Sequence, residues 1–163
     1  MVNASGNQYD TDYFGWVQQQ KKLLENRQFD ELDLDNLIEE VEGMGKSEPR
    51  SLESHLVVLL QHLLKYQYQT YILNPHMPEP KVFRSWFGRI RNARDDAGKV
   101  LLANPSLKSR LDELYVSAYR EGKKRAIREM NDYLPKQNWL TDDSYPESCP
   151  WSFEEIMTEK WLP

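Results

Sequence analysis

The segment from residue 48 to residue 68 constrains the fold more than any other part of the chain. Its apolar side chains recur at the spacing of an α-helix. Val57 and Val58 add apolar surface on the other sides, and a helix that is apolar nearly all round must be surrounded by neighbours. The sequence therefore predicts a central, enclosed helix here. Its main stripe consists of Leu52, Leu56, Leu59, Leu60 and Leu63.

Helical spacing continues on both sides of this segment. It predicts further helices over residues 11–26, 33–44 and 82–102, and from about residue 106 to residue 130. No stretch shows the alternation of apolar and polar residues that marks a half-buried strand. We therefore expect an all-α fold, a bundle of four to five helices.

The junction before the central helix leaves two possibilities open. Gly43 and Gly45 weaken the end of the preceding helix, Ser47 can cap a new one, and Pro49 is tolerated in a first turn. These residues predict a break or kink near residues 45–48. One long, kinked helix is the alternative.

The flanking helices should each pack through one apolar face. Asp10 or Thr11 is expected to cap the first of them. The polar sequence REGKKRAIREM in the last one is expected to protrude from the bundle. The face of the second helix consists of Leu34, Leu37, Ile38, Val41 and Met44. The face of the fourth consists of Phe83, Trp86, Phe87, Ile90, Ala93, Ala97 and Leu101.

Three regions follow from this pattern. Residues 1–9 are expected to form a flexible tail, residues 10–130 the bundle, and residues 131–163 a strap packed across it. Within the strap, Ser152 followed three residues later by Glu155 predicts a capping box and a short helix. The anchors of the strap would be Trp151, Phe153, Ile156 and Trp161.

Cysteine usage and hydropathy indicate the compartment. Cys149 is the single cysteine, so neither an internal disulfide nor a CxxC metal knuckle can form. The N-terminus lacks the basic start and apolar run of a signal peptide. The longest apolar run, residues 56–60, is too short to cross a bilayer. We therefore expect a cytoplasmic protein with no membrane attachment.

Charge is distributed in three blocks. Residues 1–80 carry 6 Lys and Arg against 13 Asp and Glu, a net charge of −7. Residues 81–128 carry 13 against 5, a net of +8, and residues 129–163 carry 2 against 8, a net of −6. The basic block is expected to dock between the acidic ones. A basic surface for nucleic acid or an acidic partner is the alternative.

Two histidines, His55 and His62, lie in the central helix. They are seven residues apart, which places them about 10 Å apart along the axis, too far to share one metal ion as an i, i+4 pair does. A di-iron bundle would need Glu-x-x-His pairs, and no histidine of this chain has a glutamate three residues before it. We therefore expect no metal and no cofactor, and we interpret both histidines as supporting residues at the edge of the core.

One polar cluster is nevertheless a candidate site. Asp12, Glu40 and His62 could converge from three helices as acid–base or metal-binding groups. Arg94 lies inside the apolar face of its helix, where a guanidinium needs a partner, so we expect an ion pair with Glu40, Glu42 or Asp12. Such a pair would tether helices together, and an anion-binding pocket is the alternative.

A basic face on the fourth helix is the candidate for nucleic-acid contact. Arg84, Arg91 and Lys99 lie toward its outer side and alternate with aromatic residues, as in single-strand binders. Trp86 and Phe87, however, occupy core positions and would not be free to stack on bases. The acidic flanks also compete with a phosphate backbone. Both points disfavour nucleic acid as the partner.

Six segments in this order resemble a known family. The chain is similar over residues 9–161 to a bacterial family, abundant in cyanobacteria, that is catalogued as domain of unknown function twenty-nine. The resemblance implies a compact helical bundle and no particular activity. Pro49 departs from the pattern of the family, in which the corresponding turn is continuous helix. The matching segments are DTDYFGW, LDLDNLIEEVEGMG, LLQHLLKYQYQ, SWFGRIRNAR, NPSLKSRL and YPESCPWSFEEI. The family-like polar residues are Asp12, Glu39, Glu40, His62, Gln67 and Arg94.

Three functions remain open from the sequence. The favoured one is a non-catalytic interaction module that binds a protein partner or itself. The second is an enzyme or ligand-binding bundle that uses Asp12, Glu40 and His62, with Arg94 holding an anion. The third is nucleic-acid binding through Arg84, Arg91 and Lys99. Access of solvent to His62 would separate the first two, because a catalytic or ligand-binding side chain must be reachable.

Overall fold

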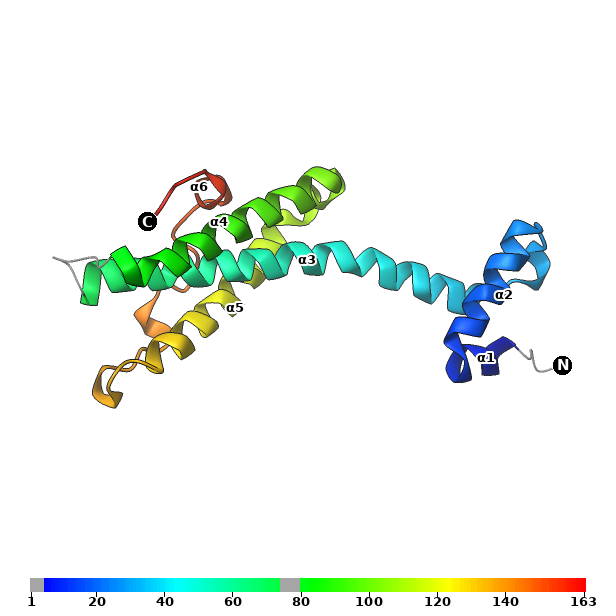
Figure 1. Ribbon diagram of the computed structural model, residues 1–163, viewed down its shortest axis with the longest axis horizontal. Coiled ribbons are helices and arrows are strands. Elements are labelled where there is room, and N and C mark those ends of the chain that lie inside the picture. The colour runs from blue at the N-terminus through cyan, green and yellow to red at the C-terminus, as the bar shows by residue number, and fades with distance from the viewer. Residues whose placement is uncertain (1–4, 74–79) are drawn as a thin grey trace. The chain divides into compact units, whose positions relative to one another are not determined.

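The fold is described from a computed structural model that covers the backbone of residues 5–73 and 80–163, and the side chains of residues 8–72 and 84–163. The secondary structure of this part of the chain is helical and contains no strand, which confirms the expected all-α class (Figure 1). The chain divides into two compact units, residues 1–47 and 48–163. The sequence had predicted other regions, a tail over 1–9, a bundle over 10–130 and a strap over 131–163, and the two compact units do not test these bounds.

The first unit begins with two short helices, α1 over Ser5–Thr11 and α2 over Tyr13–Glu25. The prediction of one helix over residues 11–26 was wrong at its start, because Asp12 leaves the helical conformation and its carboxylate accepts the backbone N–H of Gly15 at 3.0 Å. Residues 5–9 of the expected tail are therefore helical. A short 3₁₀ turn, η1 over Phe29–Glu31, leads to α3.

Helix α3 runs without interruption over Leu34–Tyr68 and so belongs to both units. The expected helix break near residues 45–48 is not present, although Pro49 lies inside the helix. Proline removes one backbone N–H and leaves the carbonyl of Gly45 without its helical donor. Residues 41–48 are exposed, so water can satisfy that carbonyl and the helix continues.

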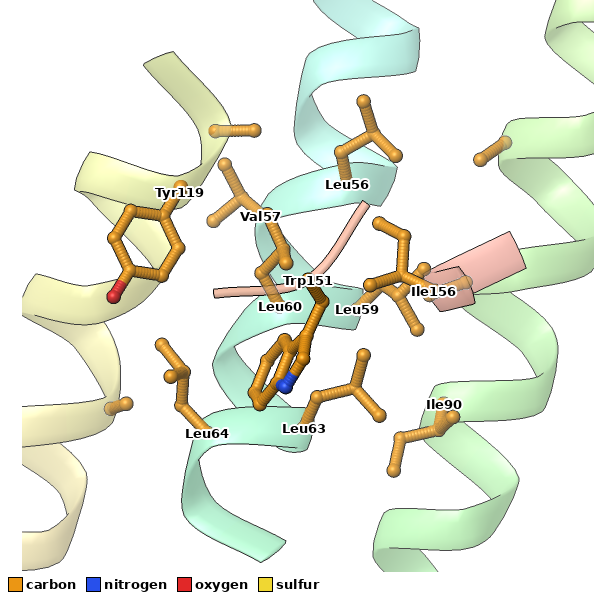
Figure 2. Packing of buried hydrophobic residues seen from close by; sticks show 14 of the residues in the cluster. Leu56, Val57, Leu59, Leu60, Leu63, Leu64, Ile90, Tyr119, Trp151 and Ile156 are labelled. Carbon is orange, nitrogen blue, oxygen red and sulfur yellow. The ribbon is translucent and has the colours of Figure 1, made fainter. Parts of the chain in front are cut away.

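The second unit packs around the second half of α3, with α4 over Pro80–Ala103 and α5 over Leu111–Asn131 on either side of it (Figure 2). The leucines of the predicted stripe are completely buried. The prediction that α3 is enclosed is therefore confirmed for this half. The proline-rich loop expected after it, residues 74–80, lies outside the described residues except for Pro80, where α4 begins.

A glycine allows α5 to approach α3 closely. A Cβ atom at Gly122 would lie 3.2 Å from the backbone N of Gln61 and 3.2 Å from the carbonyl oxygen of Val57. The expected protrusion of the end of α5 was wrong, because Ala126 and Met130 are buried in the core. The 3₁₀ segment η3 over Pro105–Arg110 connects α4 to α5.

The C-terminal strap packs on the second unit, where Leu140, Tyr145, Trp151 and Ile156 are buried in the core. It contains the turns η4 over Lys136–Asn138 and η5 over Asp142–Ser144, and the short helix α6 over Phe153–Met157. The capping box is confirmed: Ser152 accepts the N–H of Glu155 at 3.1 Å, and Glu155 accepts the N–H of Ser152 at 2.8 Å. Within the described ranges, no helix has the length and apolar character needed to span a bilayer.

Candidate functional site

The first half of α3 carries an apolar stripe that is exposed among the residues the structure describes. Leu34, Ile38, Val41 and Met44 follow one side of the helix, and their exposed fractions lie between 57% and 72%. We call these four residues the α3 stripe. The sequence predicted that these four residues and Leu37 would form a single helical face and that this face would pack; Leu37 is half-buried, whereas the other four are exposed. The helical spacing is confirmed, but the packing is not.

The α3 stripe is left open because the rest of the first unit uses another side of the helix. Glu40 accepts hydrogen bonds from the hydroxyls of Tyr9 at 2.6 Å and Tyr13 at 2.7 Å. Asp33 accepts the indole N–H of Trp16 at 3.0 Å. Trp16 is buried, with its ring centroid 4.8 Å from that of Tyr9. The two short helices are therefore held by hydrogen bonds and ring contacts on the polar side.

The two tyrosines also change the titration of this cluster. The hydrogen bond to Glu40 raises the pKa of Tyr9 to about 12. The bonds from Tyr9 and Tyr13 lower the pKa of Glu40. Glu40 is therefore a carboxylate that accepts hydrogen bonds from two tyrosines. The sequence had predicted it as a possible ion-pair partner of Arg94.

A groove between α4 and the C-terminal strap is the second open surface. It has a volume of about 890 Å³. Basic side chains of Arg84, Arg91, Lys99 and Lys160 line it, against the acidic Asp95 and Glu159. We call it the α4 groove. Its apolar lining comes from Phe87, Ile90, Leu102, Met157, Trp161 and Leu162.

The α4 groove brings together the three residues predicted as a basic face. Arg84, Arg91 and Lys99 all line it. Lys99 lies 3.4 Å from Asp96, whereas no ion pair within the described part of the chain involves Arg84 or Arg91. The core position predicted for Phe87 was wrong, since 40% of this residue is exposed. The basic face thus has an apolar floor that the sequence did not reveal.

Arg94 lies beneath this groove, and its partners are not the carboxylates that the sequence predicted. Its Nε donates to the carbonyl oxygen of Ile156 at 2.6 Å, and its NH2 group donates to that of Trp161 at 2.9 Å. Arg94 is buried, and this burial lowers its pKa. The guanidinium therefore ties the strap to α4, because it satisfies two carbonyls that would otherwise be unpaired.

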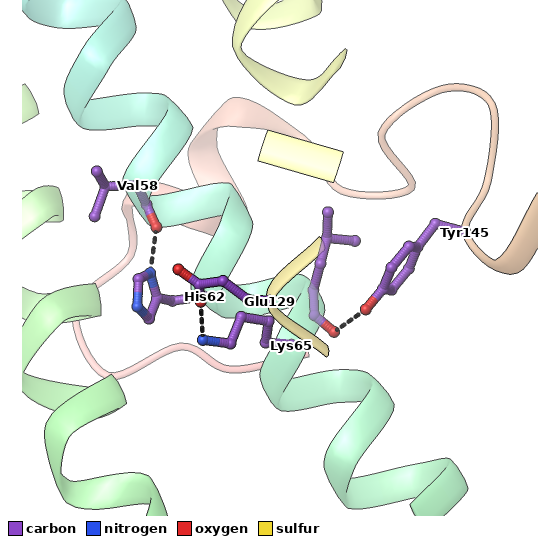
Figure 3. Close-up of polar contacts among 6 residues, drawn as sticks. Val58, His62, Lys65, Glu129 and Tyr145 are labelled. Carbon is purple, nitrogen blue, oxygen red and sulfur yellow. Dashed lines mark hydrogen bonds and ion pairs between the residues drawn. The ribbon is translucent and has the colours of Figure 1, made fainter. Parts of the chain in front are cut away.

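Asp12, Glu40 and His62, the residues of the predicted cluster, each have a different partner. Asp12 caps α2 and Glu40 binds two tyrosines, both in the first unit, while His62 lies in the second unit. His62 is only 5% exposed, and its Nδ1 donates to the carbonyl oxygen of Val58 at 2.8 Å (Figure 3). Among the side chains that the structure describes, no group of three or more His, Cys, Asp and Glu residues could hold a metal ion.

An ion pair between a buried lysine, Lys65, and a half-buried glutamate, Glu129, lies next to His62. The ammonium of Lys65 donates to Glu129 on α5 and lies 4.6 Å from the ring centroid of Trp86 on α4. Burial lowers the pKa of His62, and the positive charge of Lys65 lowers it further. The pKa of Glu129 is also lowered: burial opposes this, but the hydrogen bond and positive charge of Lys65, together with His62 and Gln61, outweigh burial. Burial therefore favours the neutral imidazole, and Lys65 connects α3 to Glu129 on α5 and to Trp86 on α4.

Sequence reasoning missed this ion pair, although a signal was present. Lys65 lies in the part of α3 that is apolar nearly all round, so its charge had to meet a partner. Cys149 is a half-buried free cysteine. Its Sγ lies 3.0 Å from the hydroxyl of Tyr115, which donates to the carbonyl of Trp151, and burial raises the pKa of the thiol.

The family of this chain is now identifiable. The family model described as "Domain of unknown function DUF29" matches residues 8–162. The chain belongs to this family. The match confirms the expected resemblance, and in this DUF29 chain it includes both the α3 stripe and the α4 groove. No curated protein and no solved structure matches the chain.

Proposed function

We propose that this chain is a protein-interaction module and that the α3 stripe is its docking surface. The observation that carries this proposal is the exposure of four large apolar side chains in a row on one helix. Contiguous apolar patches of this kind mark interaction sites on soluble proteins, whereas single exposed apolar residues do not.

The small size of the first unit supports the same conclusion. Within residues 8–47, only Trp16 and Gln20 are buried. A unit this small cannot enclose its own apolar side chains, and such units commonly need a partner. Phe14 and Phe29 add to the exposed apolar surface.

The environment of His62 favours binding over catalysis. An acid–base or metal-binding histidine needs access to a substrate or ion, and His62 is buried with its Nδ1 proton donated to the helix backbone. Asp12 and Glu40, the other two candidates, serve as a helix cap and as an acceptor for tyrosines. Each candidate catalytic group therefore has a structural task.

Photo-crosslinking in the native host tests this proposal. The photoreactive amino acid p-benzoyl-phenylalanine would replace Ile38 in the full-length chain, and Glu39 in a matched control. Glu39 is exposed on the same helix but lies on a side away from the stripe. A discrete protein adduct at position 38 and none at position 39 is expected. No protein adduct at position 38, or an adduct removed by nuclease, would overturn the proposal.

A further inference from the structure

We infer that the docking partner is a second copy of this chain, whose α4 groove receives the α3 stripe. This inference rests on the proposed function and specifies its partner. Each copy carries both surfaces: an exposed apolar stripe in an acidic unit and an apolar groove with a basic rim. The two surfaces match in charge, size and apolar character.

Charge complementarity is the first argument. Residues 1–47 carry 4 Lys and Arg against 10 Asp and Glu, a net charge of −6. Asp35 and Glu42 lie on the same helical segment as the stripe and are exposed. The groove offers Arg84 and Arg91, which make no ion pair within the described residues. Opposite charges at such a contact raise the association rate and fix its register.

Size is the second argument. From Leu34 to Met44 the helix rises by about 15 Å, at 1.5 Å per residue. The groove follows α4 from Arg84 to Leu102, a rise of about 27 Å. The stripe therefore fits within the length of the groove. Its four apolar side chains would meet the apolar lining of Phe87, Leu102 and Trp161.

Pairing of two α3 stripes with each other is disfavoured by charge. It would bring two units of net charge −6 together, and like charges across an interface destabilise it. A stripe-to-groove contact joins different surfaces. Such contacts build either a reciprocal dimer, in which each copy fills the groove of the other, or an open series of copies. Both forms are larger than a monomer.

Cysteine crosslinking between two different chains tests the contact directly. In a Cys149→Ser background, one chain carries Met44→Cys and a second, tagged chain carries Leu102→Cys. Met44 and Leu102 are both strongly exposed, so both variants should fold. Mixing them with a short bismaleimide should give a crosslinked heterodimer. The matched control replaces Leu102→Cys with Val116→Cys, which is exposed on α5 outside the groove, and should give none.

Charge reversal gives a second readout. Sedimentation equilibrium of the full chain should show reversible association, weakened by more than about tenfold in Arg84→Glu/Arg91→Glu. Adding Asp35→Lys/Glu42→Lys to the same chain should restore it. Circular dichroism of each variant should match that of the wild type.

Three results would overturn the inference. The first is a monomer at every concentration. The second is association that Ile38→Ser abolishes and the arginine reversals leave unchanged, since this indicates stripe-to-stripe pairing. The third is nucleic acid binding to the groove in place of the second copy. A protein adduct at position 38 with a different protein would leave the proposed function intact while overturning the second copy as the partner.

Discussion

The two halves of α3 follow the same helical period, but the apolar side chains of one half are exposed and those of the other are buried. In the first half, Ile38 and Val41 are mostly exposed. In the second half, Leu56 and Leu60 are completely buried among α4, α5 and the strap (Figure 2). The difference lies in the neighbours: the second unit supplies a core, while the first unit contacts α3 through tyrosines on its polar side. An apolar stripe therefore indicates which side of a helix is suited to packing. It does not indicate whether that side packs against the same chain or against another molecule.

The largest expected effect contrasts one residue from each half. Leu60→Ala removes a completely buried side chain and leaves a cavity, so it should lower the free energy of unfolding of the second unit by about 2–5 kcal/mol. Ile38→Ala removes a side chain that is 64% exposed and should change it by less than about 0.5 kcal/mol in dilute solution. Urea unfolding of both variants measures the contrast. Similar losses in the two variants would mean that the halves do not differ in burial.

A smaller loss is expected when the strap is released from α4. Arg94→Met keeps the apolar stem but leaves the carbonyls of Ile156 and Trp161 without their donor, which should cost about 2–3 kcal/mol. Arg91→Met, on the exposed rim of the same groove, is the matched control and should cost less than about 0.5 kcal/mol. Denaturant unfolding, together with the rate of trypsin cleavage near Lys160, reports both effects. Equal stability of the two variants would show that Arg94 does not hold the strap.

The pH dependence of the second unit should reflect the burial of His62. Because burial lowers its folded pKa below 6.5, the unfolded chain takes up a proton before the folded chain does as the pH falls. Stability should therefore decrease as the pH falls below about 6.5. His62→Gln, which can still donate to the carbonyl of Val58, should lose less stability between pH 7.5 and pH 5.5. If the variant lost as much stability between pH 7.5 and pH 5.5 as the wild type, His62 would not be the group responsible for this pH dependence.

The smallest expected effect lies in the first unit. Glu40→Gln replaces the carboxylate that accepts the hydroxyls of Tyr9 and Tyr13. The pKa of Tyr9 should fall from about 12 toward its usual value of 10.0. NMR titration of ¹³C-labelled tyrosine rings measures this shift. A Tyr9 pKa that is the same in the variant would mean that Glu40 does not hold this ring.

The parts of the fold that depend on local patterns were predictable. Periodicity placed the enclosed half of α3, and the spacing of Ser152 and Glu155 gave the capping box of α6. The uninterrupted course of α3 through Pro49 was not predictable from local signals, because it depends on water reaching one exposed turn. Cap choice at Asp12 differed by one or two residues from expectation, as helix ends commonly do.

The parts of the candidate site that depend on tertiary contacts were only half predictable. Helical periodicity predicted that Arg94 lies on the apolar side of its helix. Its partners, however, are backbone carbonyls, which a pattern of side chains does not reveal. The basic face of Arg84, Arg91 and Lys99 was visible in the sequence, but its apolar floor forms only when the strap packs against α4. The exposure of the α3 stripe likewise depends on tertiary packing, because the described part of the first unit has few buried residues.

Hydrogen–deuterium exchange along α3, measured at several protein concentrations, tests the central claim most directly. Amides of residues 52–65 should be strongly protected at every concentration, because they lie in the buried core. Amides of residues 34–47 should exchange quickly at low concentration and become protected as the concentration rises and the α3 stripe is covered. Uniform protection along the whole helix, independent of concentration, would contradict the claim that the first half of α3 is an open docking surface.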